Sequence, residues 1–404
     1  MFKKILDQTA PLFEKSEKGK KGGRFEKFYP LYEAADTFLY TPKEKTSGLT
    51  HVRDGMDSKR MMMTVIVALF PAILFGMYNT GLQISQGVLS IGIENVSDWH
   101  ISLMTFLGVM PDPASIYANM LLGLIYFLPI YIVTNVVGGT WEVIFCIARK
   151  HEVNEGMLVT GFLFPLILPA TIPLWQVAVG ISFGVVVAKE IFGGVGKNFL
   201  NPALAARAFL FFAYPAQLTG DTVWVIDGIS QATALSQVAE SGLADLNYTW
   251  FQCFIGTIPG SFGETSTLAI LFGAFVLMIT KIGSWRIMLS ILVTTILTAL
   301  LFNIIGSDAN PAFLLSPLWH LVVGGLAFGA VFMATDPVTA SMTSLGKYFY
   351  GGLIGVMVIL IRVVNPAFPE GMMLAILFAN LFAPLIDYFV VQNHIKRRKR
   401  RFLQ

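Results

Sequence analysis

MMMTVIVALFPAILFGMYNT, residues 61–80, has the length and apolar character of a membrane-spanning helix and contains no charged side chain. Similar apolar blocks recur along the chain, in which 55% of the 404 residues are hydrophobic and only 13% are charged. A soluble domain of that composition would be hard to keep in solution. The sequence therefore predicts an all-α polytopic membrane protein.

Hydropathy predicts about ten transmembrane helices. They are Met61–Thr80, Ile116–Val137, Met157–Pro169, Ile172–Glu190, Phe199–Tyr214, Thr267–Thr280, Arg286–Ile305, Trp319–Ala334, Gly351–Val364 and Gly371–Val391. The third, fifth and sixth contain Pro or Arg or fall below the roughly 20 residues that an upright span needs. We expect those three to be tilted, broken or shielded by neighbouring helices.

Lysine and arginine are absent from every connection that follows an odd-numbered span: Gly81–Ser115, Ala170–Thr171, Pro215–Ser266, Gly306–Leu318 and Asn365–Glu370. The positive-inside rule then places both termini in the cytoplasm. The expected division is a cytoplasmic N-terminal segment, a first transmembrane half, a periplasmic loop, a second transmembrane half and a basic cytoplasmic tail, at residues 1–60, 61–214, 215–266, 267–391 and 392–404. We interpret Lys396–Arg401 as a stop near anionic lipid and not as a nucleic-acid site.

Several chemistries are excluded by the residues available. Cys146 and Cys253 fall on opposite sides of the membrane in this topology, so we expect no disulfide between them, and two cysteines cannot supply a four-Cys iron–sulfur site. The histidines are scattered and form no helical pair for a metal. Gly193–Lys197 lacks the first glycine of a P-loop, so no nucleotide site of that kind is expected.

A seven-residue pattern in the long periplasmic loop carries the most specific chemistry. Asp227, Ser230 and Thr233 fit D-x-x-[ST]-x-A-T, the kind of site at which bacterial flavin transferases join FMN to a threonine hydroxyl. The reaction needs an exposed hydroxyl flanked by small residues. A polar turn is the alternative interpretation, but the loop lies on the side of the membrane where such transferases work.

Together with the stretches given below, this pattern makes nearly the whole chain resemble the B subunits of bacterial Na⁺-translocating NADH:quinone reductases. The residue after Ser230 is Gln231, where that family usually has glycine. The other matching stretches are Ser47–Arg60, Gly138–Glu142, Arg149–Gly156, Phe192–Pro215, Phe332–Pro337 and Leu360–Asp387.

The resemblance implies a respiratory sodium pump. Electrons would pass from a periplasmic flavin on the C subunit to FMN on Thr233, then to non-covalent riboflavin and finally to ubiquinone, coupled to Na⁺ translocation out of the cell. The implied partners are the A, C, D, E and F subunits, a flavin transferase for maturation, and the lipid of the bacterial inner membrane, which the chain crosses several times.

Amide and charged side chains at membrane depth are costly and mark candidate sites. The resemblance places Asn198 and Asn201 near the riboflavin, whereas their position before Pro202 also suits capping of the fifth helix. Arg207, further along that helix, suits an anionic reduced flavin or an ion pair with Glu190.

Three carboxylates lie near the cytoplasmic ends of expected spans: Glu142, Asp336 and Asp387. Position alone favours solvated carboxylates, while the resemblance makes Glu142 and Asp387 candidates for ion uptake. Hard oxygen ligands suit Na⁺, although the same groups could carry protons. Gly138 and Gly139 are expected in the quinone site, because glycine lets a flat ring approach the backbone; close helix packing is the alternative.

A weak internal repeat accompanies these residues. Asn201-Pro202-Ala203 begins the fifth span and Asn365-Pro366-Ala367 begins the tenth. Five spans in each half would make the halves inverted repeats, which in transporters bring broken helices together near the midplane.

Two other functions compete with the sodium pump. One is the D subunit of the Rnf electron-transport complex, which shares the flavin site; the long N-terminal segment and the stretch Arg149–Gly156 favour the pump. The other is a channel of the urea or ammonium type, suggested by the spans and the repeat, which gives no reason for the pattern ending at Thr233.

Overall fold

The computed structural model describes residues 9, 11–13, 25, 29, 32, 58–92, 96, 98–149, 156–218, 233–242, 246–307, 310–365 and 370–402. Within these ranges every regular element is a helix or a helical turn, so the predicted all-α class is confirmed for the described part of the chain.

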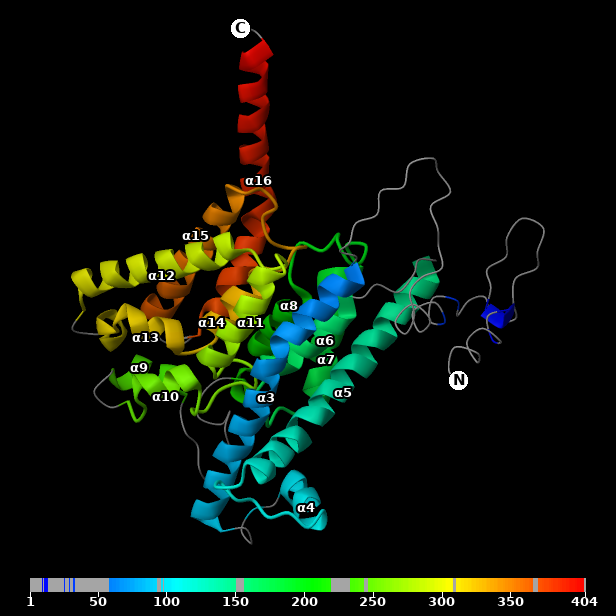
Figure 1. Cartoon of the computed structure of the whole chain (residues 1–404), viewed down its shortest axis with the longest axis vertical. Coiled ribbons are helices and arrows are strands. Elements are labelled where there is room, and N and C mark those ends of the chain that lie inside the picture. Colours follow the sequence, from blue (N-terminus) through cyan, green and yellow to red (C-terminus); the bar gives the residue numbers. More distant parts are fainter. Residues whose placement is uncertain are drawn as a thin grey trace.

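Two long helices frame the first half. α3 (Ser58–Ile91) and α5 (Ile116–Arg149) are each 34 residues long and pack side by side, with the short α4 (Trp99–Phe106) at their shared end (Figure 1). Both run past the spans expected from hydropathy. The extension of α3 packs against α5, where Ser85 donates a hydrogen bond of 2.8 Å to the side chain of Asn119.

Shorter helices fill the space beside this pair: α6 (Gly156–Leu166), α7 (Leu174–Val185) continuing into the π-helical turn η3 (Val186–Glu190), and α8 (Pro202–Ala213). α7 packs against both α5 and α8. α8 begins at Pro202 rather than at Phe199, because proline has no N–H to donate and suits the first turn of a helix.

The loop between the two halves is partly helical, with η4 (Pro215–Gln217), α9 (Ala234–Ser241) and α10 (Trp250–Ile255). α9 and α10 share a small apolar cluster with α13 that includes Leu235, Cys253 and Val323. Figure 1 shows α9 and α10 on one side of the body, below α13 in that view. The loop is therefore anchored where it carries Thr233, the residue just before α9.

The second half contains α11 (Thr267–Ile279), α12 (Trp285–Ile305), η6 (Pro311–Leu314), α13 (Pro317–Val322), α14 (Leu326–Phe328), the π-helical turn η7 (Gly329–Met333), α15 (Gly346–Val364) and α16 (Met372–Phe402). α15 packs against α12 and α16, as α7 packs against α5 and α8.

The expected eighth span is broken between α13 and α14. Gly324 has a φ of +72°, a conformation that favours glycine, and it lies in the break. The Arg362 guanidinium donates to the carbonyls of His320 (2.8 Å) and Val323 (3.0 Å). These bonds satisfy carbonyls that the end of α13 leaves without helical partners.

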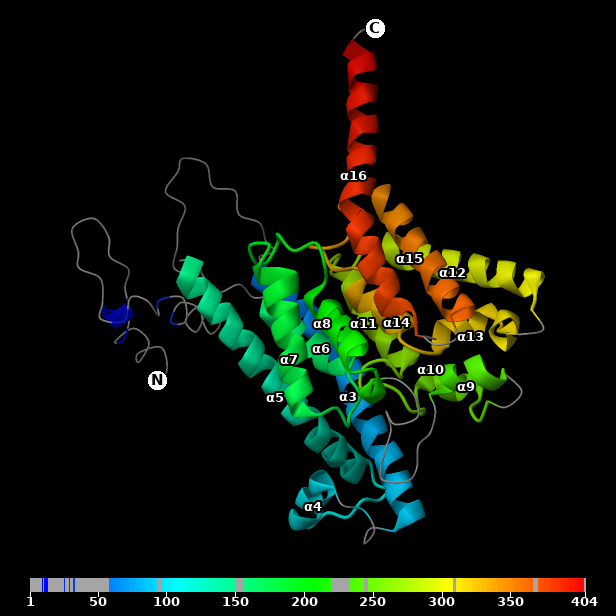
Figure 2. The same ribbon diagram turned by 180° about the vertical axis from the view of Figure 1, so that it is seen from behind.

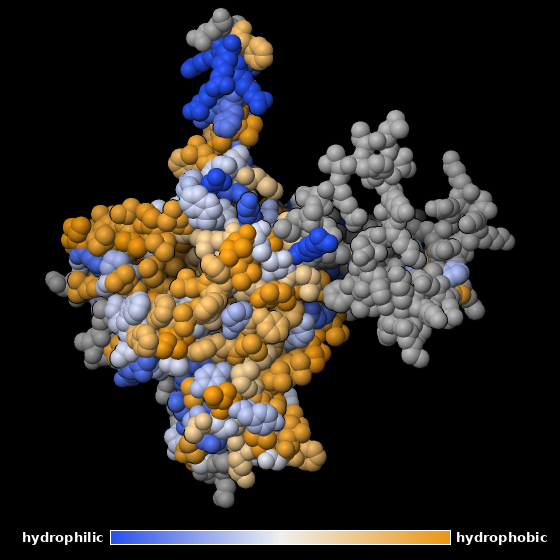
Figure 3. Space-filling view, in the orientation of Figure 1, coloured by the Kyte–Doolittle hydropathy of each residue, from blue (hydrophilic) through white to orange (hydrophobic). Residues whose placement is uncertain are grey.

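In the part of the chain that the structure describes, five helices are long and apolar enough to cross a membrane: those ending at Ile91, Arg149, Ile305, Val364 and Phe402. α6, α8 and α11 are shorter apolar helices, which agrees with the short third, fifth and sixth spans expected from the sequence. Apolar side chains cover much of the body in Figure 3. These features identify a membrane protein.

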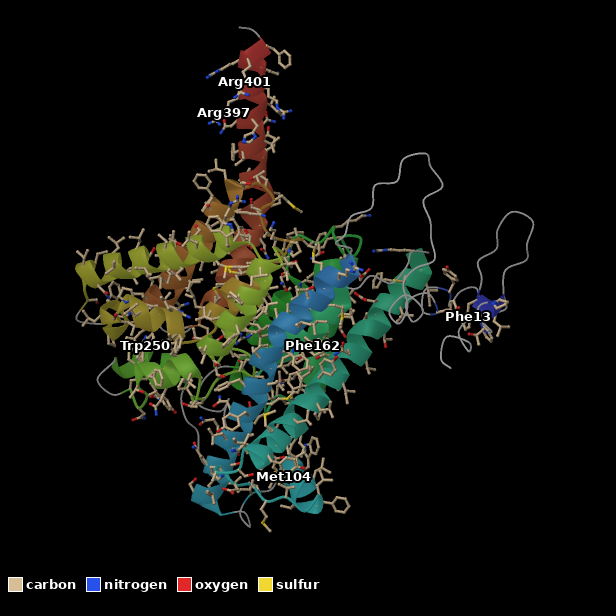
Figure 4. All side chains as sticks on the ribbon, viewed as in Figure 1. Phe13, Met104, Phe162, Trp250, Arg397 and Arg401 are labelled. Atoms are coloured by element: carbon tan, nitrogen blue, oxygen red, sulfur yellow. The ribbon has the colours of Figure 1, made fainter. Side chains whose placement is uncertain are left out.

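α16 continues well beyond the other helices. Figures 1 and 2 show its C-terminal part projecting alone from the body, and Figure 3 shows that this part is hydrophilic. The labelled Arg397 and Arg401 in Figure 4 lie on that projection, away from every other helix. The basic tail is thus a continuation of the last helix.

Candidate functional site

A cavity lies between the two halves of the chain and is lined by residues of both. The space that protein atoms leave free there is about 750 Å³, which includes a part that is open to the surroundings. Its walls come from α3, α6, α8, α11 and the turns η3 and η7 and are mostly apolar. Its polar side chains are Thr160, Lys189, Asn198, Asn201, Thr335 and Asp336. A mostly apolar cavity with a few convergent polar groups is typical of a small-molecule site.

The two asparagines at this cavity also organise the start of α8. The Asn201 side chain accepts from the backbone N–H groups of Ala203 (3.0 Å) and Leu204 (3.3 Å), and so caps the helix. The Asn198 side chain donates to the carbonyl of Leu200 at 3.0 Å. The expected capping of α8 is therefore observed for Asn201 and not for Asn198, and both residues line the cavity.

The hydropathy places Glu142 near the end of a span. In the structure it lies inside α5 instead, where it is buried and ion-paired with Lys189. The Lys189 ammonium also lies 3.9 Å from a carboxylate oxygen of Glu190, and Arg149 lies 3.6 Å from the other oxygen of Glu190. Because Lys189 lines the cavity, this cluster connects Glu142 to it.

Asp336 lies on the cavity wall just after η7. Its carboxylate accepts from the Thr339 hydroxyl (2.9 Å) and from the Val338 backbone N–H (3.1 Å). The structure thus brings Asp336, Asn198 and Asn201 to one cavity, with Glu142 reached through Lys189.

Gly138 and Gly139 have different environments. A Cβ on Gly138 would lie 2.2 Å from the Met157 side chain and 3.2 Å from that of Ile181, so this glycine permits close packing of α5 against α6 and α7. A Cβ on Gly139 would have no neighbour within 4 Å. Of the two, only Gly139 leaves room beside the backbone for another molecule.

Arg207 lies outside this cavity wall and does not pair with Glu190, contrary to one expectation from the sequence. Its guanidinium donates to Glu264 at 2.7 Å and to Glu370 at 2.6 Å. All three side chains line a second, smaller cavity beside the break before α14. The charge of Arg207 is thus already matched by two carboxylates.

Thr233 is the N-cap of α9. Its hydroxyl oxygen accepts from the backbone N–H of Ser236 at 3.3 Å and lies 3.0 Å from the hydroxyl of Ser236. The side chain is half-buried, so its oxygen stands at the positive end of the helix. Asp227 and Ser230 lie outside the described residues.

Asp387 holds the turn before α15. Its carboxylate accepts from the hydroxyls of Ser341 (2.7 Å) and Thr343 (2.6 Å) and from the backbone N–H groups of Met342 (2.7 Å) and Thr343 (3.0 Å). These four bonds nearly fill the acceptor sites of the carboxylate. Asp387 is not among the residues that line either cavity.

Outside the membrane-spanning helices, the pKa values of Asp98 and Cys253 are among those that are shifted. Burial disfavours the charged form of Asp98, but hydrogen bonds from His100 and Tyr126 outweigh it and hold the pKa of this carboxyl below its usual value. Burial raises the pKa of the Cys253 thiol to about 11. Cys146 and Cys253 are both buried and neither forms a disulfide.

Sequence reasoning missed the partners of the buried cations. Lys189, Glu264 and Glu370 were not singled out in the sequence. A general signal was available for the two glutamates, because a buried arginine requires a carboxylate nearby.

The chain is similar to known proteins over nearly its whole length. The model of the NQR2, RnfD, RnfE family matches residues 45–396. A protein of Chromohalobacter salexigens, named as the B subunit of Na(+)-translocating NADH-quinone reductase, is 60% identical over 403 residues, covering 99% of this chain and 96% of that protein. Proteins of the same name from Klebsiella pneumoniae and Neisseria meningitidis are each 58% identical, covering 99% and 94% of this chain and 99% and 95% of their own lengths.

Proposed function

Because the chain belongs to the NQR2, RnfD, RnfE family, we propose that it is the B-type membrane subunit of a respiratory Na⁺ pump that oxidises NADH and reduces ubiquinone. The observation that carries this proposal is the 60% identity to a protein named as that subunit, which extends over 99% of the chain. The chain then acts with the A, C, D, E and F subunits in the bacterial inner membrane.

The family description also includes RnfD. The near-full-length identity to proteins named as quinone reductase subunits favours the sodium pump over that relative. A urea or ammonium channel explains neither the family match nor the threonine pattern.

Thr233 is the proposed attachment site for FMN, through a phosphodiester to its hydroxyl. The support is its place at the N-terminus of α9, where backbone N–H groups and the helix dipole favour the negative charge of a phosphate. Thr233 is also only half-buried, so a transferase could approach it from the exposed side. This residue belongs to the expected periplasmic loop, where an external flavin on the C subunit could reach it.

The cavity lined by Asn198 and Asn201 is the proposed riboflavin site. A flavin ring is flat and apolar on its faces, with amide-like donors and acceptors on one edge. The cavity offers apolar walls together with two amides, two hydroxyls, one ammonium and one carboxylate. Bound at these two places, the flavins supply electron transfer, while the chain holds, orients and charge-balances them.

Quinone reduction is proposed beside Gly139 on α5. The open space at its Cα gives a ring room to approach, whereas Gly138 is filled by neighbouring side chains. The ion path is proposed to use Glu142 and Asp336, which lie at or next to the cavity, with Asp387 nearer the cytoplasmic surface. Four donors already satisfy Asp387, so a cation there would have to replace some of them.

We further propose ten crossings arranged as two inverted five-helix repeats. The similar packing of α7 between α5 and α8 and of α15 between α12 and α16 supports the repeat. A helix also coincides with each stretch expected to span.

Intact-mass measurement of the purified chain tests the flavin proposal. Wild-type protein should carry the mass of one FMN, Thr233→Ala should lack it, and Thr249→Ala should retain it. Thr249 is a matched control, because it also caps a helix in the same loop but lies outside the pattern. An unchanged flavin adduct in Thr233→Ala would disprove the attachment site.

A further inference from the structure

Lys189 stands between the large cavity and a buried carboxylate. It lies on the π-helical turn η3, and its side chain is only 4% exposed. Its ammonium pairs with Glu142, yet the same side chain forms part of the cavity wall. Among the described residues that line the cavity, it is the only cationic side chain.

The charges around Lys189 balance when nothing else is bound. Lys189 and Arg149 carry two positive charges, and Glu142 and Glu190 carry two negative ones. Arg149 lies beside Glu190, which leaves Lys189 as the close partner of Glu142. A new negative charge in the cavity would therefore compete with Glu142 for the same ammonium, since buried charges interact strongly when little water screens them.

We propose that Lys189 couples the charge in the cavity to cation binding at Glu142. Negative charge in the cavity draws the ammonium away from Glu142, and the uncovered carboxylate then takes up a monovalent cation, Na⁺ in this protein. This inference rests on the proposed function, in which the cavity holds a non-covalent flavin. The flavin proposed to occupy the cavity would gain one electron, and the preceding flavin would lose it. One cation enters beside Glu142, and no covalent bond forms or breaks.

The local structure permits such a movement. A lysine ends in a point charge on a flexible four-carbon stem, so its ammonium can shift between two partners without moving the helix. Gly156 lies beside the ammonium: a Cβ on that glycine would lie 3.8 Å from the ammonium nitrogen and 2.7 Å from the Val195 side chain, so the absence of a side chain here leaves the ammonium its space. π-helical turns of this kind occur frequently at functional sites.

The test uses the assembled complex and two readouts other than turnover: the midpoint potential of the non-covalent flavin and equilibrium binding of ²²Na⁺ in the oxidised and reduced states. Wild type should bind Na⁺ at least about fivefold more tightly when reduced. Lys189→Met should lower the midpoint potential, by about 59 mV for each tenfold loss of preference for the reduced state. It should also bind Na⁺ equally in both states, because no ammonium covers Glu142.

Lys197→Met is the matched control, since it removes an exposed positive charge that does not line the cavity. It should leave both readouts at wild-type values. Glu142→Gln should lose the redox-dependent Na⁺ binding while riboflavin stays bound. If the buried Glu142 destabilises Lys189→Met, the neutral pair Glu142→Gln with Lys189→Met serves for the potential measurement.

The two levels of the proposal fail differently. Wild-type complex without non-covalent flavin would overturn the proposed function. Normal riboflavin content in Lys189→Met, with the midpoint potential and the redox dependence of Na⁺ binding both unchanged, would overturn the coupling through Lys189 alone.

Discussion

Replacement of Arg207 by methionine should strongly destabilise the chain, because it removes a buried positive charge that pairs with two carboxylates. The side chains of Arg207 and Glu264 are each 8% exposed, and that of Glu370 is 32% exposed. The replacement therefore leaves one deeply buried and one partly solvated carboxylate without this positive partner. Breaking a buried pair from one side typically costs about 3–5 kcal/mol.

Neighbouring charges place the expected cost at the lower end of that range. The Arg362 guanidinium is close enough to interact with both carboxylates and would partly compensate for the missing charge. We therefore expect a loss of roughly 3 kcal/mol for Arg207→Met. Glu370→Gln should cost only about 1 kcal/mol, because partly exposed ion pairs contribute little.

SDS-induced unfolding in mixed micelles, followed by tryptophan fluorescence, measures these differences. The combined replacement of Arg207 by Met and Glu264 by Gln should recover much of the lost stability, because Glu370 remains beside the Arg362 guanidinium and no deeply buried charge is left unpaired. Arg286→Met is the control, since its guanidinium makes a hydrogen bond of 3.4 Å to Ser344 near the surface. A loss below about 1 kcal/mol for Arg207→Met, equal to that of the control, would refute the reasoning.

Three further predictions follow from local geometry. Because the folded-state pKa of Asp98 is lowered, its stabilisation is fully present above the usual pKa of about 3.9 and is lost as pH falls through the folded value. Asp98→Asn, which weakens the bond to His100, should therefore lower Tm more at pH 7 than at pH 3. Cys253, with a pKa raised to about 11, should react with a maleimide at pH 7 only after denaturation, and rapid labelling of native protein would contradict its burial. Gly346→Ala should cost about 1–3 kcal/mol in the same SDS assay, because its Cβ would lie 2.3 Å from a side-chain oxygen, whereas Gly139→Ala, with open space, should change stability by under about 0.5 kcal/mol.

The helical stretches could be predicted because burial in lipid requires long apolar helices, and hydropathy detects that requirement directly. Helix ends could not, because hydropathy reports lipid contact and not hydrogen bonding. α5 therefore continues from Val137 to Arg149, and Glu142 lies inside a helix where an end was expected. The break in the eighth span had a local signal in Gly324-Gly325, which the apolar run around it concealed.

The candidate site was predictable only where a local pattern carries the chemistry. Asn201 before a proline indicates a helix cap, and the structure confirms that cap. The partners of Arg207 lie 57 and 163 positions away along the chain, and no local pattern encodes contacts at such separations. The expected pair with Glu190 was wrong because proximity in sequence was taken for proximity in space.

The two ionic clusters constrain how a redox-driven cation pump could work in this chain. The first cluster has two cations, Lys189 and Arg149, and two carboxylates. The second has two carboxylates, and its charges match when the nearby Arg362 is counted with Arg207. Neither cluster therefore has a vacant site for a cation at rest. A cation can enter only after a resident positive charge has moved or a new negative charge has arrived, because an unbalanced buried charge is costly. Arg207 is held by two carboxylates, whereas Lys189 adjoins a cavity that can receive negative charge. Under the proposed coupling, electron arrival therefore acts on the Lys189 cluster first, and Glu142 is then the carboxylate most directly controlled by the redox state.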